Sequence, residues 1–323
     1  MPAVAGDTSH SVIARVARRW RAIDPLLPPP GIPARRCPAG LIAAGGGTAF
    51  GTCEHWAASP GSLDLSWGAA RRFELAPRIA GPDVAGPLEE LLSRWRDHLR
   101  GVPGAGDEDT AALVTWPSRD IDGVTSLLRH GLVPLEVIAA RRTSGEGAAA
   151  TAGAAPETAG GVLVRRAGPS DMDEVVRLGV EVVRYDSHFG GVRMRPGTAG
   201  AMRRQVAGLL AGAEPWTWLA ERDGTAIGLL AAQRPEAAGW ISPMVGAGPA
   251  AYLMLMFVEP PDRGSGAADA LTARFSREAA SAGVAVTLLH YEMLNPRSGP
   301  FWSRQGYRPL WTVWDARPAT ALR

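Results

Sequence analysis

Residues 252–306 contain the side chains whose types and spacing are suited to chemistry. The apolar run at residues 252–260 has no helical polar face, which predicts a strand buried on both sides. The sequence RGSGAA at residues 263–268 leads into a segment with helical spacing of its apolar side chains. Gly264 and Gly266 let the backbone approach a ligand closely, and the N–H groups that start a helix favour an anion. The sequence therefore predicts a phosphate site, and the alternative is a turn that only starts a helix.

Two common phosphate-binding motifs do not fit this turn. A Walker-type loop needs a lysine, which the sequence lacks, and Asp269 stands where a GxGxxG motif needs its last glycine. The register of Arg263, Gly266 and Ala268 instead resembles the acyl-CoA signature of the GNAT N-acetyltransferase superfamily, which is arginine or glutamine, then xxGx, then glycine or alanine. The resemblance implies acetyl-CoA, or another acyl-CoA, as co-substrate, and no metal is expected.

The resemblance continues downstream of the turn. Residues 284–295 predict another buried strand, and Asn295 followed by Pro296 is suited to cap and start a short helix. The family places an asparagine here, then an aromatic pair, which this sequence matches with Phe301 and Trp302. For Asn295 the resemblance implies a hydrogen bond to the CoA arm, and the alternative is a helix cap alone.

The resemblance also implies a splayed pair of strands whose backbone N–H groups hold the pantetheine and the thioester oxygen. The acyl-CoA-binding residues that it implies are Met256, Phe257, Val258, Arg263, Gly264, Ser265, Gly266, Ala267, Ala268, Asn295, Phe301 and Trp302.

Acyl transfer to an amine needs a base, and His290 is the first candidate. It stands five residues before Asn295, where some family members that act on peptide amines carry a catalytic glutamate. Imidazole titrates near neutral pH and can take the amine's proton. The alternative is a core histidine with one hydrogen bond. Glu292 shares the strand face and is the second candidate, and Glu259 is a weaker one.

The general acid is where the sequence departs from the family. Many members carry a tyrosine as the second aromatic residue, and this sequence has Trp302 there. An indole N–H does not release a proton near neutral pH. Water, Tyr291 or Tyr307 are the remaining candidates for protonating the leaving thiolate.

The acceptor amine is expected to bind where a helix that starts near residue 170 ends. Tyr185, Asp186 and His188 cluster there, and Asp186 is suited to hold a cationic substrate. The alternative for this cluster is a solvated surface. Residues 236–250 are irregular in pattern and are expected to border the acceptor pocket.

The two halves of the chain have similar patterns, which predicts an α/β fold of two tandem GNAT-like domains. Each domain would be a mixed, mostly antiparallel twisted sheet flanked by helices. The predicted boundaries are residues 1–142 for a degenerate domain, 143–160 for an Ala/Gly-rich linker and 161–323 for the acyltransferase domain. The first domain is not expected to bind CoA, because Asp83 would repel phosphate and Pro87 has no N–H to donate.

Composition excludes several classes of function. The 323 residues are 46% apolar and 20% charged with a net charge of +2, which is typical of a globular protein and does not favour nucleic-acid binding. No apolar run is long enough to cross a membrane, and no secretory signal opens the sequence, so a cytoplasmic location is expected. Cys37 and Cys53 are too few for a disulfide scaffold or a zinc site, and the six histidines form no ligand pair.

The leading interpretation is an N-acyltransferase that moves an acetyl or short acyl group from acyl-CoA to a primary amine of a small molecule. One alternative is a protein or peptide N-acetyltransferase, which needs an open groove. The other is a non-catalytic CoA-binding regulatory or scaffold protein. The oligomeric state is left open.

Overall fold

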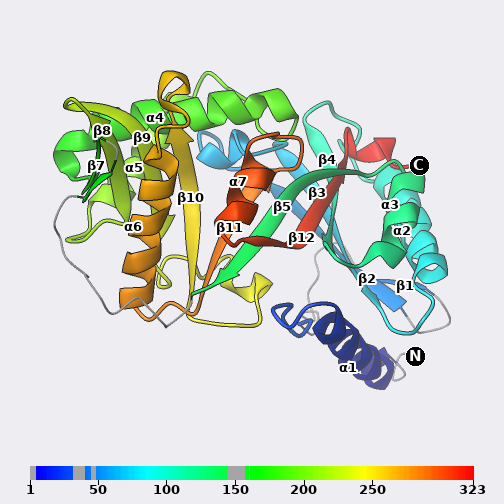
Figure 1. The fold of residues 1–323 in the computed structure, drawn as a ribbon. Helices are drawn as coiled ribbons and strands as arrows, with labels where there is room; N and C mark the ends of the chain where they lie inside the picture. Colours follow the sequence, from blue (N-terminus) through cyan, green and yellow to red (C-terminus); the bar gives the residue numbers. More distant parts are fainter. Residues whose placement is uncertain (1–4, 32–40, 45–48, 144–156, 160) are drawn as a thin grey trace. The chain divides into compact units, whose positions relative to one another are not determined.

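The computed structural model describes residues 5–31, 41–44, 49–143, 157–159 and 161–323 (Figure 1). The chain divides into two compact units, each described by itself below. The first unit consists of Met1–Ser59, Ala69–Ile138 and Pro309–Arg323, and the second of Pro60–Gly68 and Ala139–Arg308. Cys37 and most of the predicted linker at residues 143–160 lie outside the described residues.

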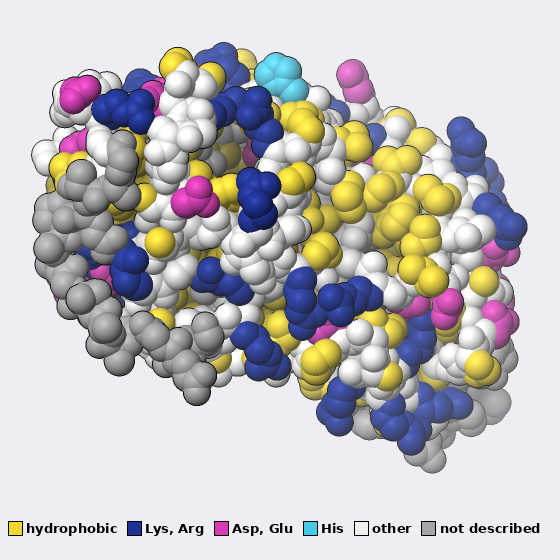
Figure 2. Space-filling view, viewed as in Figure 1, with side chains coloured by type: hydrophobic (Ala, Val, Ile, Leu, Met, Phe, Trp, Pro, Cys, Tyr) yellow, Lys and Arg dark blue, Asp and Glu magenta, His cyan; other side chains and the backbone are white. Residues whose placement is uncertain are grey.

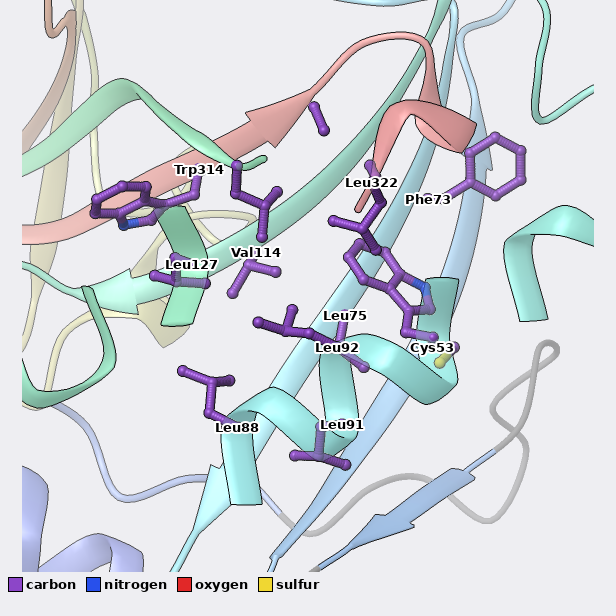
Figure 3. Close-up of a cluster of buried hydrophobic side chains, with 14 of the residues drawn as sticks. Cys53, Phe73, Leu75, Leu88, Leu91, Leu92, Val114, Leu127, Trp314 and Leu322 are labelled. Atoms are coloured by element: carbon purple, nitrogen blue, oxygen red, sulfur yellow. The ribbon is translucent and has the colours of Figure 1, made fainter. Parts of the chain in front are cut away.

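The first unit is a sheet with the strand order β1-β2-β3-β4-β12. Its elements are α1 (Ala5–Ile23), β1 (Leu41–Ala44), β2 (Ala49–Ala57), β3 (Arg71–Ile79), α2 (Ala85–Arg100), β4 (Thr110–Pro117), α3 (Val124–Arg129) and β12 (Arg308–Ala316). β3 and β4 are parallel, and the other pairs are antiparallel. The apolar stripe of α2, with Leu88, Leu91 and Leu92, packs with Leu75 and Val114 of the sheet (Figure 3).

The second unit has the strand order β11-β10-β9-β8-β7-β6. Its elements are β6 (Glu157–Ala159), β7 (Val162–Arg166), α4 (Met172–Asp186), α5 (Thr198–Leu210), β8 (Thr217–Arg222), β9 (Thr225–Gln233), β10 (Ala250–Val258), α6 (Ala267–Ser281), β11 (Val286–Glu292) and α7 (Ser298–Arg304). β10 and β11 are parallel, and the other pairs are antiparallel. The predicted α/β fold, with mixed and mostly antiparallel sheets flanked by helices, is confirmed.

Helices cover both faces of the second unit's sheet. Trp218 of β8 contacts Phe275 of α6, while its neighbour Leu219 belongs to the core formed with α4 and α5. Successive side chains of a strand point to opposite faces, so α6 lies on one face and α4 with α5 on the other. Leu255 and Phe257 of β10 belong to the core on the α4 and α5 face.

The parallel strands β10 and β11 separate part of the way along. Their pairing runs from Ala250 with Val286 to Leu253 with Leu289. β10 then continues to Val258 paired with β9, after a register shift between Leu253 and Leu255 that marks a β-bulge. This is the splayed pair that the sequence predicted for the C-terminal half.

The order of elements is similar in the two halves of the sequence, but the compact units do not follow those halves. β2, β3, α2, β4 and α3 repeat the order of β9, β10, α6, β11 and α7, yet Pro309–Arg323 belongs to the first unit. β5 (Val133–Arg142) begins in the first unit and ends in the second. A duplicated fold with a degenerate first copy stays a prediction. At the start of α2, the Asp83 carboxylate accepts a hydrogen bond from the N–H of Gly86 at 3.3 Å, at the position where a phosphate would have to bind.

Three properties of the described residues concern membrane insertion, metal binding and nucleic-acid binding. No helix among them has the length and apolar character needed to span a membrane. Nor do they contain a group of three or more His, Cys, Asp or Glu side chains that could hold a metal ion. On the face drawn in Figure 2, arginines occur at many separate places. Cys53 is buried in the first unit.

Candidate functional site

The glycine turn has the geometry that its sequence predicts. Gly264 and Gly266 have φ values of +86° and +85°, the left-handed region that favours glycine, and α6 begins directly after Gly266. A Cβ atom built on either glycine would meet nothing within 4 Å, so the space in front of the turn is open. The first turn of α6 therefore presents its N–H groups at an open surface that can take a phosphate.

Arg263 connects this turn to the end of β10. Its Nε donates to the carbonyl oxygen of Val258 at 3.2 Å, and its guanidinium lies 4.9 Å from the centre of the Tyr185 ring and 5.8 Å from that of Phe257. An arginine held against aromatic rings in this way stays close to the turn. Tyr185, which was predicted to bind the acceptor amine, thus lies beside Arg263, which was predicted to bind CoA.

Met256, Phe257 and Val258 lie on the part of β10 that has left β11. The register pairs them with Leu230, Leu229 and Gly228 of β9, on one edge of β10 only. Because strand N–H and C=O groups alternate between the two edges, half of them in this stretch point toward the opening between β10 and β11. An extended ligand such as pantetheine can pair with such an edge.

His290 lies in a cluster of aromatic rings on the α4 and α5 face. Its Nδ1 is 3.1 Å from the hydroxyl oxygen of Tyr252, whose ring stands at 76° to the imidazole. Trp240 lies nearly parallel to the imidazole, at 13° and 6.1 Å between ring centres. Trp240 belongs to residues 236–250, the irregular segment predicted to border the acceptor pocket, so the structure brings that segment to His290.

Glu292 lies on the same face as His290 and is only 5% exposed. A Cβ atom on Gly191 would collide with its carboxylate oxygen Oε1, so the loop after α4 packs directly against this carboxylate. A side chain at position 191 would therefore displace the Glu292 carboxylate from its place. Glu259, the weakest candidate base, is in an ion pair with Arg177, which leaves His290 and Glu292 as the candidates on this face.

The structure gives the three predicted acceptor residues different surroundings, although the ring centres of Tyr185 and His188 are only 6.4 Å apart. α4 ends at Asp186, whose carboxylate accepts a hydrogen bond from Asn295 Nδ2 at 3.1 Å. Burial raises the pKa of Asp186 to about 6, against the opposing effect of that hydrogen bond. His188 is exposed, and its Nδ1 lies 3.0 Å from the carbonyl oxygens of Arg184 and Tyr185 in its own helix. Asp186 thus lies against Asn295, which was predicted to bind CoA. His188 makes no such contact among the described residues.

Asn295 has the capping role that was the alternative to CoA binding. Its Oδ1 accepts hydrogen bonds from the backbone N–H groups of Arg297 at 3.0 Å and Ser298 at 3.3 Å, and it is 5% exposed. The expected strand at residues 284–295 is shorter than predicted because a turn, with the N–H of Asn295 bonded to Glu292 O, follows β11. The hydrogen bond from Asn295 to CoA stays a prediction.

The aromatic pair is packed into the protein. Trp302 is 6% exposed and makes edge contacts with Phe301 and Tyr307 at 4.9 and 5.4 Å between ring centres. Tyr307 is 3% exposed, and its hydroxyl is 2.9 Å from that of Thr287. Burial raises the pKa of Tyr307, so its hydroxyl is protonated at neutral pH, and a role for it as proton donor stays a prediction.

Tyr291 lies on the opposite face of β11 from His290 and is partly exposed. Burial raises the pKa of its hydroxyl above the ordinary value, so the group is protonated at neutral pH and able to donate. It lies near α7, since a Cβ atom on Gly299 would be 3.8 Å from its ring. Tyr291, Tyr307 and water therefore remain as candidates for the acid, and of the two tyrosines Tyr291 is the more exposed.

The sequence analysis missed a segment of the N-terminal half that belongs to this site. Pro60–Gly68 is part of the second unit, and Leu63 is buried in the core with α4 and α5. Ser66 Oγ is 2.8 Å from Thr198 Oγ1, and Arg195 donates to the carbonyl oxygens of Leu65 and, at 3.3 Å, Gly68. These contacts hold residues 190–198, the loop that packs against Glu292. The segment lies more than a hundred residues from its partners, and no local pattern signals the contact.

Comparisons with known proteins identify the family of the second unit. Residues 197–307 match the model of the acetyltransferase (GNAT) family. A GCN5-related N-acetyltransferase from Sphaerobacter thermophilus superimposes with a TM-score of 0.52 and 14% identity, over 84% of this chain and 77% of that chain, which shows a shared fold.

Two further structures are similar at lower scores. An acetyltransferase of the GNAT family from Colwellia psychrerythraea has a TM-score of 0.49 and 12% identity, over 83% of this chain and 80% of that chain. A GCN5-related N-acetyltransferase from Kribbella flavida has a TM-score of 0.46 and 15% identity, over 98% and 95%. The comparison with curated proteins found no match. The match shows a domain of the acetyltransferase (GNAT) family at residues 197–307, and the splayed strands and the glycine turn lie within that range.

Proposed function

We propose that the protein is an acyl-CoA-dependent N-acetyltransferase that transfers an acetyl or short acyl group to a primary amine of a small molecule. The GNAT family uses acetyl-CoA, and the observation that carries the proposal for this chain is the pairing of β10 with β11, which stops at Leu253 and Leu289 beside the open glycine turn. The turn would bind the pyrophosphate, and the opening between the strands would take the pantetheine.

The reaction is a direct attack on the thioester. The amine nitrogen forms a bond to the carbonyl carbon, the bond from that carbon to sulfur breaks, and the thiolate leaves as CoA. One proton passes from the amine to a base, and one is given to the thiolate. Backbone N–H groups of Met256 to Val258 that face the opening would stabilise the oxyanion.

His290 is the proposed base, with Glu292 as the second candidate. Both lie on the face that the α4 loop covers, on the part of β11 beyond its pairing with β10. The proton donor proposed for the thiolate is Tyr291 or water. Tyr291 is partly exposed, whereas Tyr307 is 3% exposed with its hydroxyl against that of Thr287, and an indole such as Trp302 does not release a proton near neutral pH.

A small-molecule acceptor is favoured over a protein by the burial of this region. Glu292 and Asn295 are each 5% exposed, and Gly191 packs directly on Glu292. A small amine reaches such groups more readily than a side chain carried on a folded protein.

The proposal is tested by calorimetric titration of acetyl-CoA into the wild-type protein and into the variants Gly264→Glu and Gly283→Glu. Both glycines have positive φ with nothing within 4 Å of a built Cβ, so the two substitutions introduce similar backbone strain at opposite ends of α6. Gly264→Glu places a carboxylate in the phosphate site and should abolish binding, while Gly283→Glu should bind as the wild type does.

Release of CoA in the presence of a panel of primary amines then measures transfer. Unchanged acetyl-CoA affinity in Gly264→Glu would show that the turn is not the phosphate site. Binding without CoA release for any amine would favour the non-catalytic alternative.

A further inference from the structure

The strongest feature that the proposed reaction does not use is an exposed aromatic ring beside the candidate base. Trp240 is 57% exposed, although its indole N–H donates to Gln233 Oε1 at 2.8 Å, which fixes the orientation of the ring. It meets Tyr252 edge-on at 4.9 Å and 81°, and it is nearly parallel to His290. These three rings, Trp240, Tyr252 and His290, are named here the ring wall. Trp240 supplies its exposed flat apolar surface, since Tyr252 is only 8% exposed.

The exposed apolar residues of the second unit lie on chain segments that adjoin the residues of the candidate site. Among its described residues, the large hydrophobic side chains that are exposed are Met194, Trp240, Met293 and Leu294. Trp240 belongs to the ring wall, and Met293 and Leu294 directly follow Glu292. Met194 lies three residues beyond Gly191, which packs on Glu292.

A carboxyl group on the same face can pair with an amine. Glu292 lies on the same strand face as His290, two residues further along, so its carboxyl group shares the face of the ring wall. Aromatic faces attract both flat apolar groups and cations. A ligand with an ammonium group at one end and an apolar ring at the other matches both features.

We propose that the ring wall binds the body of the acceptor, and that the acceptor is an arylalkylamine, a primary amine carried on an aromatic group by a short alkyl chain. This inference rests on the proposed function, since it names the acceptor class of the same site. The amine nitrogen lies toward His290 and Glu292, and the aromatic group lies against Trp240.

The test compares 2-phenylethylamine with ethanolamine, a short amine that has no apolar body, at saturating acetyl-CoA. We expect KM for 2-phenylethylamine to be at least about tenfold lower, the factor that about 1.4 kcal/mol of contact gives. Trp240→Ala should raise KM for 2-phenylethylamine about tenfold and change KM for ethanolamine little. Trp240→Phe, which keeps a flat ring, should retain most of the affinity. Trp56→Ala is the matched control, because Trp56 is also exposed, at 38%, but belongs to the first unit.

Two results would overturn the proposal that the ring wall binds the acceptor. One is an equal KM for the two amines in the wild type, and the other is an equal effect of Trp240→Ala on both. Failure of the proposed function gives a different result, because no amine would then cause release of CoA. In that case calorimetry with 2-phenylethylamine and CoA decides: binding that Trp240→Ala removes supports the ring wall, and no binding rejects it.

Discussion

Asp186 makes the stability of the second unit depend on pH in a direction opposite to that of a typical carboxylate. Burial raises its pKa from 3.8 to about 6. The folded protein therefore holds this proton more tightly than the unfolded chain does, and the free energy of unfolding falls as pH rises from about 4 to above 6. At about 1.4 kcal/mol for each tenfold change in proton affinity, the cost of ionising Asp186 reaches about 3 kcal/mol at pH 8.

The substitution Asp186→Asn removes this cost and keeps the shape of the side chain. The amide retains an oxygen that can accept the hydrogen bond from Asn295 Nδ2. We expect the variant to be more stable than the wild type by up to about 3 kcal/mol at pH 8 and by about 1 kcal/mol at pH 4.5, where the wild-type carboxyl is mostly protonated in the folded state.

Urea unfolding of both proteins at pH 8 and pH 4.5 measures the difference. The difference between variant and wild type isolates Asp186, because every other titrating group is common to both. Asp173→Asn is the control: it changes an exposed carboxylate at the start of the same helix, paired with Arg203. It should alter stability by less than about 1 kcal/mol at either pH. An Asp186→Asn gain that is the same at the two pH values, or a loss at pH 8, would refute the assignment of the raised pKa to this group.

Two further predictions concern the base and the segment from the N-terminal half. His290→Ala should lower kcat/KM at neutral pH by about a hundredfold without changing acetyl-CoA affinity, because it removes the proposed base. A pH–rate profile identical to that of the wild type would move the base to Glu292. Arg195→Ala should lower the free energy of unfolding by about 2 kcal/mol, since a charged donor to the carbonyl oxygens of Leu65 and Gly68 is lost, and should raise KM for the amine. Unchanged urea unfolding would show that these bonds do not hold Pro60–Gly68 in place.

The elements that carry the proposed acyl-CoA site could be read from the sequence because their causes are local. Gly264 and Gly266 are the residues that a left-handed turn favours, and the apolar runs on either side predict buried strands whatever their partners are. β10, the turn, α6 and β11 were therefore expected in this order, and the structure has them so.

The contacts of the residues around the proposed acceptor site were decided by the tertiary structure. Asp186 and Asn295 are 109 positions apart, and the sequence alone could not tell that they share a hydrogen bond that leaves His188 outside. The placement of Gly191 against Glu292 and of Trp240 against His290 likewise follows from how separate segments meet.

The sequence by itself determined the glycine turn, the strand and helix around it and the family that they indicate. Only the tertiary structure decided that Asn295 caps a helix, that Tyr307 is buried and that Pro60–Gly68 packs into the second unit. The physical reason is the range of the interactions. Turns and apolar periodicity depend on neighbours in the chain, whereas burial, pKa shifts and hydrogen bonds between distant segments exist only once the chain has folded.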